Sequence, residues 1–240
     1  MLLSIREDEA ADDEYSAMLR FSGLTQIGLR SIRLTQRSLG SIDLAEWSGI
    51  ILGGGPYNVS DASESKSSTQ RRVESELLPL IGRVVECDFP FLGCCYGVGT
   101  LGSIVGATVD RRYTEPVGAL TVTLTPAGRR DPLFEDLPDT FDAYGGHKEA
   151  ASSLPPQAVC LASSATCPVQ AFRVGENVYA TQFHPELDVD GICTRIDAYK
   201  NDGYFAPEAA ESLKSDARQW KVEHPPVILR RFIERYTRPR

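Results

Sequence analysis

The order of apolar and polar positions predicts strands that alternate with helices through the first half of the chain. Short apolar runs bounded by turn residues indicate buried strands, and apolar residues at helical spacing indicate helices packed on one side. Because strands alternate with helices, the sequence favours a central, mostly parallel sheet flanked by helices on both faces. The expected strands are 2–5, 32–34, 49–52 and 89–92, the helices are 9–22, 69–81 and 97–104, and the polar stretch 60–68 is expected to be a mobile loop.

The second half shows a different pattern. Residues 117–124 alternate apolar and polar positions, which predicts a strand in a small antiparallel layer. Further short strands are expected at 158–162, 169–174 and 178–183, and the pattern beyond residue 190 turns helical and ends in a helix over 227–236. No linker is long enough to separate two domains. We therefore expect one α/β domain over 1–240, with 191–240 as a helical C-terminal extension.

Composition and charge exclude several classes of function. With 240 residues, 42% of them hydrophobic and 24% charged, the chain can bury a sizeable core. A net charge of −8 argues against nucleic acid or an anionic membrane as the main partner. No apolar run approaches the ~18–20 residues that span a bilayer, and the N-terminus lacks the pattern of a secretory signal, so we expect a cytoplasmic protein. The cysteine spacing contains no pair of C-x-x-C clusters, so neither a metal site nor a cofactor is expected.

A candidate nucleophile lies directly after the strand expected at 89–92. Residues 91–97 read Phe-Leu-Gly-Cys-Cys-Tyr-Gly, the cysteine counterpart of the strained strand-to-helix turn that exposes a reactive side chain. Gly93 and Gly97 leave room for this turn around Cys95. The start of a helix and a nearby imidazole both favour the thiolate, so we expect Cys95 to be activated. The neighbouring Cys94 points the other way and should pack in the core.

A candidate base lies far downstream, where residues 182–186 read Gln-Phe-His-Pro-Glu. Alternation along an extended segment places His184 and Glu186 on one face, so that the carboxylate can orient the imidazole. His184 is the expected general base for Cys95. A nucleophile, a base and an orienting acid make up a catalytic triad.

Cleavage of an amide passes through an oxyanion that needs fixed hydrogen-bond donors. The backbone N–H of Tyr96 can be one donor, because it follows the nucleophile. The run Gly53-Gly54-Gly55-Pro56 comes directly after a strand and can aim a second N–H at the same point. A phosphate-binding loop is the alternative for such a run, but the Lys-Ser/Thr pair that a nucleotide loop needs does not follow it.

These motifs make the chain resemble the class I glutamine amidotransferases, most closely the glutaminase domain of the GMP synthase type. The resemblance is strongest over residues 45–190. It implies a domain that releases ammonia from the side-chain amide of glutamine and passes it to a partner active site. It also implies that Gly55 is the second oxyanion donor, and that Gly54, Tyr144 and Gly145 contact the substrate. His147, in the same stretch as Tyr144, has either a surface role or a ligand contact.

One position departs from this family. Its members usually continue the turn as Gly-x-Gln, and the glutamine side chain helps to bind the substrate, whereas this chain reads Gly97-Val98-Gly99. We therefore expect weak glutaminase activity with a high KM in the isolated chain. Replacing Gly99 by Gln should lower KM if the pocket has kept the space for the longer side chain.

The leading hypothesis is a cysteine-dependent glutamine amidotransferase that supplies ammonia to a separate synthase subunit. One alternative keeps the triad but hydrolyses γ-glutamyl amides or peptides. A second alternative is a non-catalytic regulatory subunit with the same fold. The sequence does not name the ammonia acceptor.

Overall fold

A computed structural model describes residues 1–201 and 203–237, so that 238–240, the end of the expected C-terminal extension, lie outside it. Its centre is a nine-stranded sheet in the order β2-β1-β3-β4-β11-β10-β9-β6-β7. The first five strands are parallel to one another, and the ladders from β11 to β7 are antiparallel. The parallel strands are β2 (Ser31–Arg33), β1 (Leu2–Ser4), β3 (Ile50–Leu52), β4 (Phe91–Cys94) and β11 (Val178–Thr181). The antiparallel continuation consists of β10 (Ala171–Val174), β9 (Ala158–Ser163), β6 (Glu115–Leu124) and β7 (Thr140–His147).

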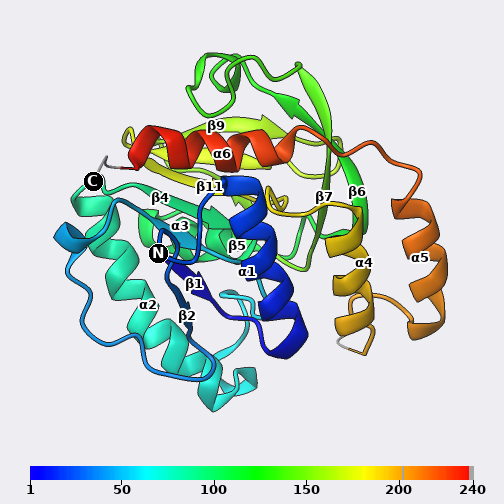
Figure 1. Cartoon of the computed structure of the whole chain (residues 1–240), viewed down its shortest axis with the longest axis horizontal. Coiled ribbons are helices and arrows are strands. Elements are labelled where there is room, and N and C mark those ends of the chain that lie inside the picture. Colours follow the sequence, from blue (N-terminus) through cyan, green and yellow to red (C-terminus); the bar gives the residue numbers. More distant parts are fainter. Residues whose placement is uncertain (202, 238–240) are drawn as a thin grey trace.

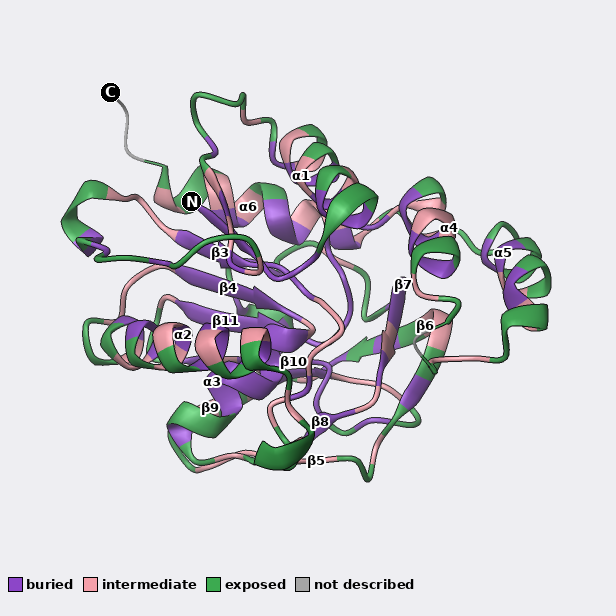
Figure 2. Cartoon of the chain, turned by 90° about the horizontal axis from the view of Figure 1, so that it is seen from below, coloured by how far each residue is buried: buried purple, intermediate pink, exposed green. Residues whose placement is uncertain are grey.

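Helices cover both faces of the parallel half of the sheet (Figures 1 and 2). Helices α1 (Asp8–Ser22) and α6 (Pro225–Tyr236) lie on one face, and α2 (Ser68–Glu86) and α3 (Tyr96–Val105) lie on the other. Two further helices, α4 (Val189–Ala198) and α5 (Ala210–Ala217), stand at the end of the molecule beside β6 and β7. The architecture is therefore a three-layer α/β fold, as the sequence predicts.

Each parallel strand divides its side chains between two cores. In β3, Ile50 and Leu52 pack into the cluster that includes residues of α2 and α3, whereas Ile51 packs into the cluster that includes residues of α1 and α6. In β4, Phe91 belongs to the first core and Cys94 to the second. Alternation along a strand produces this division, and burial on both faces explains why these strands read as continuous apolar runs.

The antiparallel region differs in detail from the expectation. Strand β6 continues the main sheet, and the separate small sheet pairs β5 (Thr108–Asp110) with β8 (Ala150–Ser153). Strand β7 is not predicted by the sequence, because its Tyr144-Gly145-Gly146 stretch resembles a turn. Pairing with the full length of β6 nevertheless holds this stretch extended.

Helix α2 runs beyond its expected end at residue 81, to Glu86, and contains Pro79. A proline inside a helix removes the hydrogen bond to the carbonyl four residues earlier. Here that carbonyl belongs to Ser75, and both Ser75 and Pro79 are exposed, so water can satisfy it. Val84 is fully buried and continues the apolar face past the proline. Packing therefore extends the helix that the proline would otherwise end.

The polar stretch 60–68, expected as a mobile loop, is tied to α2. It contains a short 3-10 turn, Ser63–Ser65. The ammonium of Lys66 donates to the Val59 carbonyl at 2.8 Å and to Glu74 Oε2 at 2.7 Å. Both Lys66 and Glu74 are largely buried.

The carboxyl ends of β1, β3, β4 and β11 meet along one edge of the sheet. The glycine run follows β3, Cys95 follows β4, and the Gln-Phe-His-Pro-Glu segment follows β11. In open α/β sheets this edge is where ligands bind. In the described part of the chain, no helix is both long and apolar enough to cross a membrane.

The close approach of β4 and α3 makes a prediction about stability. A Cβ at Gly93 would lie 2.8 Å from the backbone Cα of Gly97, so we expect Gly93→Ala to destabilise the fold by ~1–3 kcal/mol. Gly82 in α2 is the matched control, because a Cβ there meets no atom within 4 Å. Gly82→Ala should stabilise the helix by ~0.5–1 kcal/mol. Urea unfolding of both variants measures the two effects, and equal shifts would contradict the packing described.

Candidate active site

Cys95 occupies a strained turn between β4 and α3. Its backbone has φ 53° and ψ −86°, a conformation that L-residues rarely adopt. The turn is held by the Cys95 N–H, which donates to the Thr181 carbonyl at 2.7 Å. The neighbouring Cys94 is fully buried. The expected elbow is therefore present, and it separates the two adjacent cysteines.

His184 and Glu186 lie just after β11 and are buried. The His184 N–H donates to the Tyr144 carbonyl at 2.9 Å, and His184 Nδ1 lies 2.8 Å from Glu186 Oε1. Because the carboxylate accepts from Nδ1, the proton of the neutral ring sits there and Nε2 is free to act as a base. Arg195 Nη2 donates to the same carboxylate oxygen at 3.0 Å.

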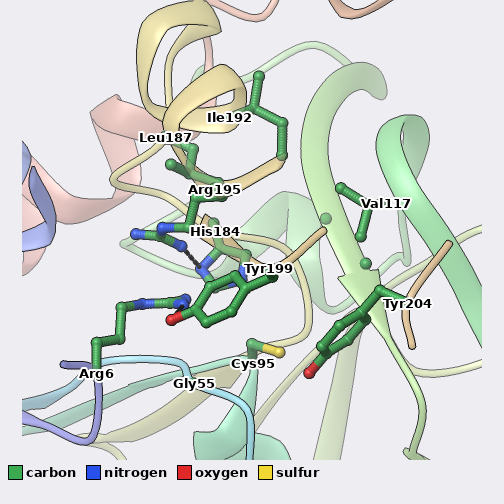
Figure 3. A pocket seen from close by; sticks show the side chains of 12 residues that line it. Arg6, Gly55, Cys95, Val117, His184, Leu187, Ile192, Arg195, Tyr199 and Tyr204 are labelled. Carbon is green, nitrogen blue, oxygen red and sulfur yellow. Dashed lines mark hydrogen bonds between the residues drawn. The ribbon is translucent and has the colours of Figure 1, made fainter. Parts of the chain in front are cut away.

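The glycine run brings Cys95 and His184 together. A Cβ at Gly54 would lie 2.6 Å from His184 Cε1, 3.3 Å from Cys95 Cβ and 2.9 Å from Arg6 Nη2. The thiol, the imidazole and a guanidinium thus surround one point. Figure 3 shows Cys95 and His184 facing the same cavity.

The neighbouring glycines are required by space as well. A Cβ at Gly53 would lie 2.5 Å from Glu14 Oε1, and one at Gly55 would overlap the side chain of Ile5. Gly55 lines the cavity beside Cys95. Tyr96 is the first residue of α3, and the first N–H groups of a helix have no partner within the helix. Both expected oxyanion donors therefore belong to segments that border Cys95.

The cavity is lined by both expected and unexpected residues. Gly145 lines it, but the Tyr144 side chain points to α5, where its hydroxyl donates to the Ala217 carbonyl at 2.8 Å. Any contact of Tyr144 with a ligand would have to come from its backbone. The other lining residues are Arg6, Val117, Gly146, Leu187, Ile192, Arg195, Tyr199 and Tyr204.

Three polar groups at the site were missed from the sequence. Arg6 follows β1, is 3% exposed and lines the cavity. Arg195 lies on the buried face of α4. Gln182 is buried, and its Nε2 lies 3.9 Å from Cys95 Sγ, within reach of a weak N–H to sulfur bond. A lone cation after an apolar strand, or among the isoleucines of a helix, is the only sequence signal for the two arginines.

Burial keeps the thiol and the imidazole neutral in the resting site. It raises the pKa of Cys95 to about 11, with Arg6 opposing this shift and Glu149 adding to it. It lowers the pKa of His184 to about 4, although Glu186 acts in the opposite direction. Burial also raises the pKa of Glu186, but His184, Arg195 and Arg6 outweigh it, so that this carboxyl stays ionised. The expected activation of the thiol by its place at the helix start is thus outweighed by desolvation.

A second polar cluster lies outside the cavity. His147 is buried, with Nδ1 2.9 Å from the Glu149 carbonyl and Nε2 2.8 Å from Glu115 Oε2, so it has neither the surface role nor the ligand contact considered from the sequence. Burial raises the pKa of Glu115, but hydrogen bonds from His147, Ser164 and Thr166 outweigh it and lower that pKa to about 2.

Glu115, His147 and Cys167 lie close enough to suggest a metal site. The carboxylate of Glu115, however, already accepts four hydrogen bonds, from His147, Ser164, Thr166 and Gln170. A carboxylate offers about four lone pairs, so none is left for a metal ion. The cluster fits a structural network that ties the turn before β10 to β6 and β7.

Comparison with known proteins supports the interpretation of the motifs. The chain matches the family model of class-I glutamine amidotransferases over residues 21–190. It is 26% identical over 166 residues to a separate subunit of the glutamine-hydrolyzing GMP synthase of Thermoplasma acidophilum, covering 69% of this chain and 76% of that protein. It is 30% identical over 150 residues to the corresponding subunit from Picrophilus torridus, covering 60% of this chain and 70% of that one. It spans about a quarter of the GMP synthase of Petrotoga mobilis, matching 26% of that length.

Solved structures share the fold. A glutamine amidotransferase from Thermotoga maritima superimposes with a TM-score of 0.77 at 22% identity, covering 98% of this chain and 96% of that one. A glutamine amidotransferase from Methylobacillus flagellatus gives 0.71 at 17% identity, covering 100% and 95%. The α/β architecture with its mixed sheet is therefore that of known glutamine amidotransferases.

The raised pKa of Cys95 makes a prediction about thiol reactivity. Only the thiolate is alkylated, so the rate of Cys95 alkylation by iodoacetamide should rise steadily from pH 6 to pH 10 without a plateau, because its pKa is about 11. Peptide mapping follows Cys95 separately from the exposed Cys87, which reports on the reagent. A rate at Cys95 that is independent of pH between 6 and 9 would instead indicate a preformed thiolate–imidazolium pair.

Proposed function

Because the chain belongs to the class I glutamine amidotransferase family, we propose that it hydrolyses the side-chain amide of L-glutamine through a thioester on Cys95. The observation that carries this proposal is the geometry around Gly54. There the elbow thiol and the imidazole of His184 face one point, and Glu186 holds the far side of the ring. A nucleophile, a base and an orienting carboxylate in this relation are the parts that acyl transfer requires.

The first half of the reaction forms the thioester. Cys95 Sγ attacks the amide carbon of glutamine while His184 Nε2 takes the thiol proton. The carbonyl oxygen becomes an oxyanion, which the N–H groups of Gly55 and Tyr96 stabilise. When the tetrahedral intermediate collapses, His184 gives its proton to the leaving nitrogen and ammonia departs.

The second half releases glutamate. A water molecule attacks the thioester carbon and gives a proton to His184 Nε2. The same N–H donors stabilise the second oxyanion. The carbon–sulfur bond then breaks, the proton returns to Cys95 Sγ, and the site regains its starting state. Glu186 keeps its hydrogen bond to Nδ1 throughout and stabilises the imidazolium that forms twice.

Two neighbouring groups favour negative charge on sulfur as the reaction starts. The guanidinium of Arg6 opposes the rise in the pKa of Cys95 that burial causes. The amide of Gln182 donates toward Cys95 Sγ. Since desolvation strengthens such interactions, they act where the thiol must lose its proton.

The ammonia is proposed to pass to a separate synthase subunit. Two relatives are named as one subunit of a glutamine-hydrolyzing GMP synthase, and this chain covers most of each. Those names support glutamine as the substrate and a partner polypeptide as the acceptor. A GMP synthase is the first partner to test.

A second candidate function is hydrolysis of a γ-glutamyl amide or peptide with the same triad. Gly99 favours it, because the glutamine side chain that family members use for substrate binding is missing. Release of glutamate from glutamine supports the first function. Turnover of γ-glutamyl compounds alone supports the second, and a folded protein that neither turns over these substrates nor reacts at Cys95 with a glutamine-analogue electrophile would be a non-catalytic subunit.

The identity of the nucleophile can be tested directly. Cys95→Ala should abolish both glutamate release and labelling by a diazoketone analogue of glutamine, because the attacking sulfur is removed. Cys94→Ala is the control, since Cys94 is buried in the opposite core and its loss should leave the label on Cys95. Mass spectrometry of the labelled peptide gives the answer, and a label on Cys94 would overturn the assignment.

The roles of the base and its orienting acid predict a ranking. His184→Ala removes the proton carrier and should lower kcat roughly 10²- to 10⁴-fold. Glu186→Gln keeps the ring in place but removes charge support, so its loss should be smaller. Steady-state kinetics on variants with wild-type circular dichroism make the comparison. If the Glu186 variant were the slower of the two, the roles would have to be exchanged.

A further inference from the structure

The space that a glutamine at position 99 would need is already occupied. A Cβ at Gly99 would overlap Oε1 of Glu149 and lie 3.2 Å from Val59 Cγ2. Gly99 lies in the first turn of α3, one turn after Cys95. The pocket has therefore not kept room for the family's glutamine, and Gly99 is needed to admit the carboxylate of Glu149.

Glu149 uses this position to hold a backbone loop. Its Oε1 accepts from the N–H of Val59 at 2.9 Å, and its Oε2 accepts from the N–H of Ser60 at 2.8 Å. The residue is 6% exposed. Burying a carboxylate is costly unless both oxygens are hydrogen-bonded, and two charge-assisted bonds to consecutive N–H groups meet that condition.

The loop held by Glu149, residues 53–60, contains the oxyanion glycines at one end and Val59 and Ser60 at the other. Its carbonyl groups are held from the opposite side, because Lys66 donates to the Val59 carbonyl and Gln70 Nε2 donates to the Asn58 carbonyl at 3.0 Å. Glu149 thus supplies the acceptors, and α2 with its preceding turn supplies the donors. Together they fix both kinds of backbone group near the same point.

We propose that Glu149 is a positioning residue for the reaction, which fixes the loop 53–60 and thereby the Gly55 N–H, in the space that Gly99 leaves open. This inference rests on the proposed function, since it assigns Gly55 to the oxyanion. The chain has exchanged a substrate-binding glutamine on α3 for a carboxylate that reaches the site from the segment between β7 and β8. The expectation for Gly99→Gln therefore changes: alone, it should collide with Glu149 and leave KM unimproved.

The test compares two isosteric variants of the same chemistry. Glu149→Gln keeps the shape but leaves one backbone N–H facing an amide NH2. Asp88→Asn is the matched control, because Asp88 also accepts from two consecutive N–H groups, those of Glu176 and Asn177 at 3.0 Å each, yet it precedes β4 at the opposite edge of the sheet. Both variants lose a buried or half-buried clamp, but only one clamp lies at the site.

We expect Glu149→Gln to lower kcat for glutamine roughly 10- to 100-fold with KM within about twofold, because a displaced oxyanion donor acts in the transition state. Asp88→Asn should leave kcat within about twofold, and any loss of stability in it calibrates the merely structural effect. Gly99→Gln should lower kcat, and Gly99→Gln with Glu149→Ala should recover part of the loss. An unchanged kcat in folded Glu149→Gln, or a lowered KM in Gly99→Gln alone, would overturn the proposal.

A second measurement separates this inference from the proposed function. Amide hydrogen exchange in the peptide that covers residues 53–60 should rise at least about tenfold in Glu149→Gln and remain unchanged in Asp88→Asn, whatever the chain catalyses. If the wild-type chain released no glutamate and took no label, the proposed function would fail, and exchange would still decide whether Glu149 fixes the loop. Unchanged exchange in Glu149→Gln would show that it does not.

Discussion

Four charged side chains lie buried behind Cys95, and their mutual neutralisation is the constraint on which the rest of the site depends. Arg6 Nε lies 3.0 Å from Glu14 Oε1, and Arg195 Nη2 lies 3.0 Å from Glu186 Oε1 and 4.0 Å from Glu14 Oε1. An isolated ion in such a place would cost several kcal/mol. Because each charge has an opposite neighbour, β1, α1, α4 and the segment after β11 must stay in one arrangement.

This charge cluster also dictates part of the local sequence. Gly53 has no room for a Cβ because the Glu14 carboxylate lies against it, and Gly54 has none because Arg6 and His184 do. The glycine run therefore answers two demands at once. It aims N–H groups at the thiol, and it lets the loop lie directly on the buried ions. A Gly-rich loop after a strand is usually interpreted from the first demand alone.

The sequence locates what is local and misses what is assembled from distant segments. The elbow around Cys95 and the pair of His184 and Glu186 are each contained within a few residues, so their spacing is informative. The pairing of Arg6 with Glu14 and of Arg195 with Glu186 depends on how four elements pack, which no periodicity records. The occupation of the space beside Gly99 by Glu149, 50 positions away, is likewise a tertiary fact. Strand β7 was missed because pairing with β6 overrides the turn preference of two adjacent glycines.

The contact between Arg6 and Tyr199 bears on the order in which the molecule is made. Arg6 Nη1 donates to the Tyr199 hydroxyl at 2.7 Å, across 193 positions of the chain. A ribosome delivers β1 and α1 first, and α4 with Arg195 and Tyr199 only after most of the polypeptide has been synthesised. Until then Glu14 can be matched by Arg6, but His184, Glu186 and the wall formed by α4 do not yet exist. The sulfur of Cys95 remains an ordinary cysteine on the nascent chain, and its chemistry begins only when synthesis is nearly over.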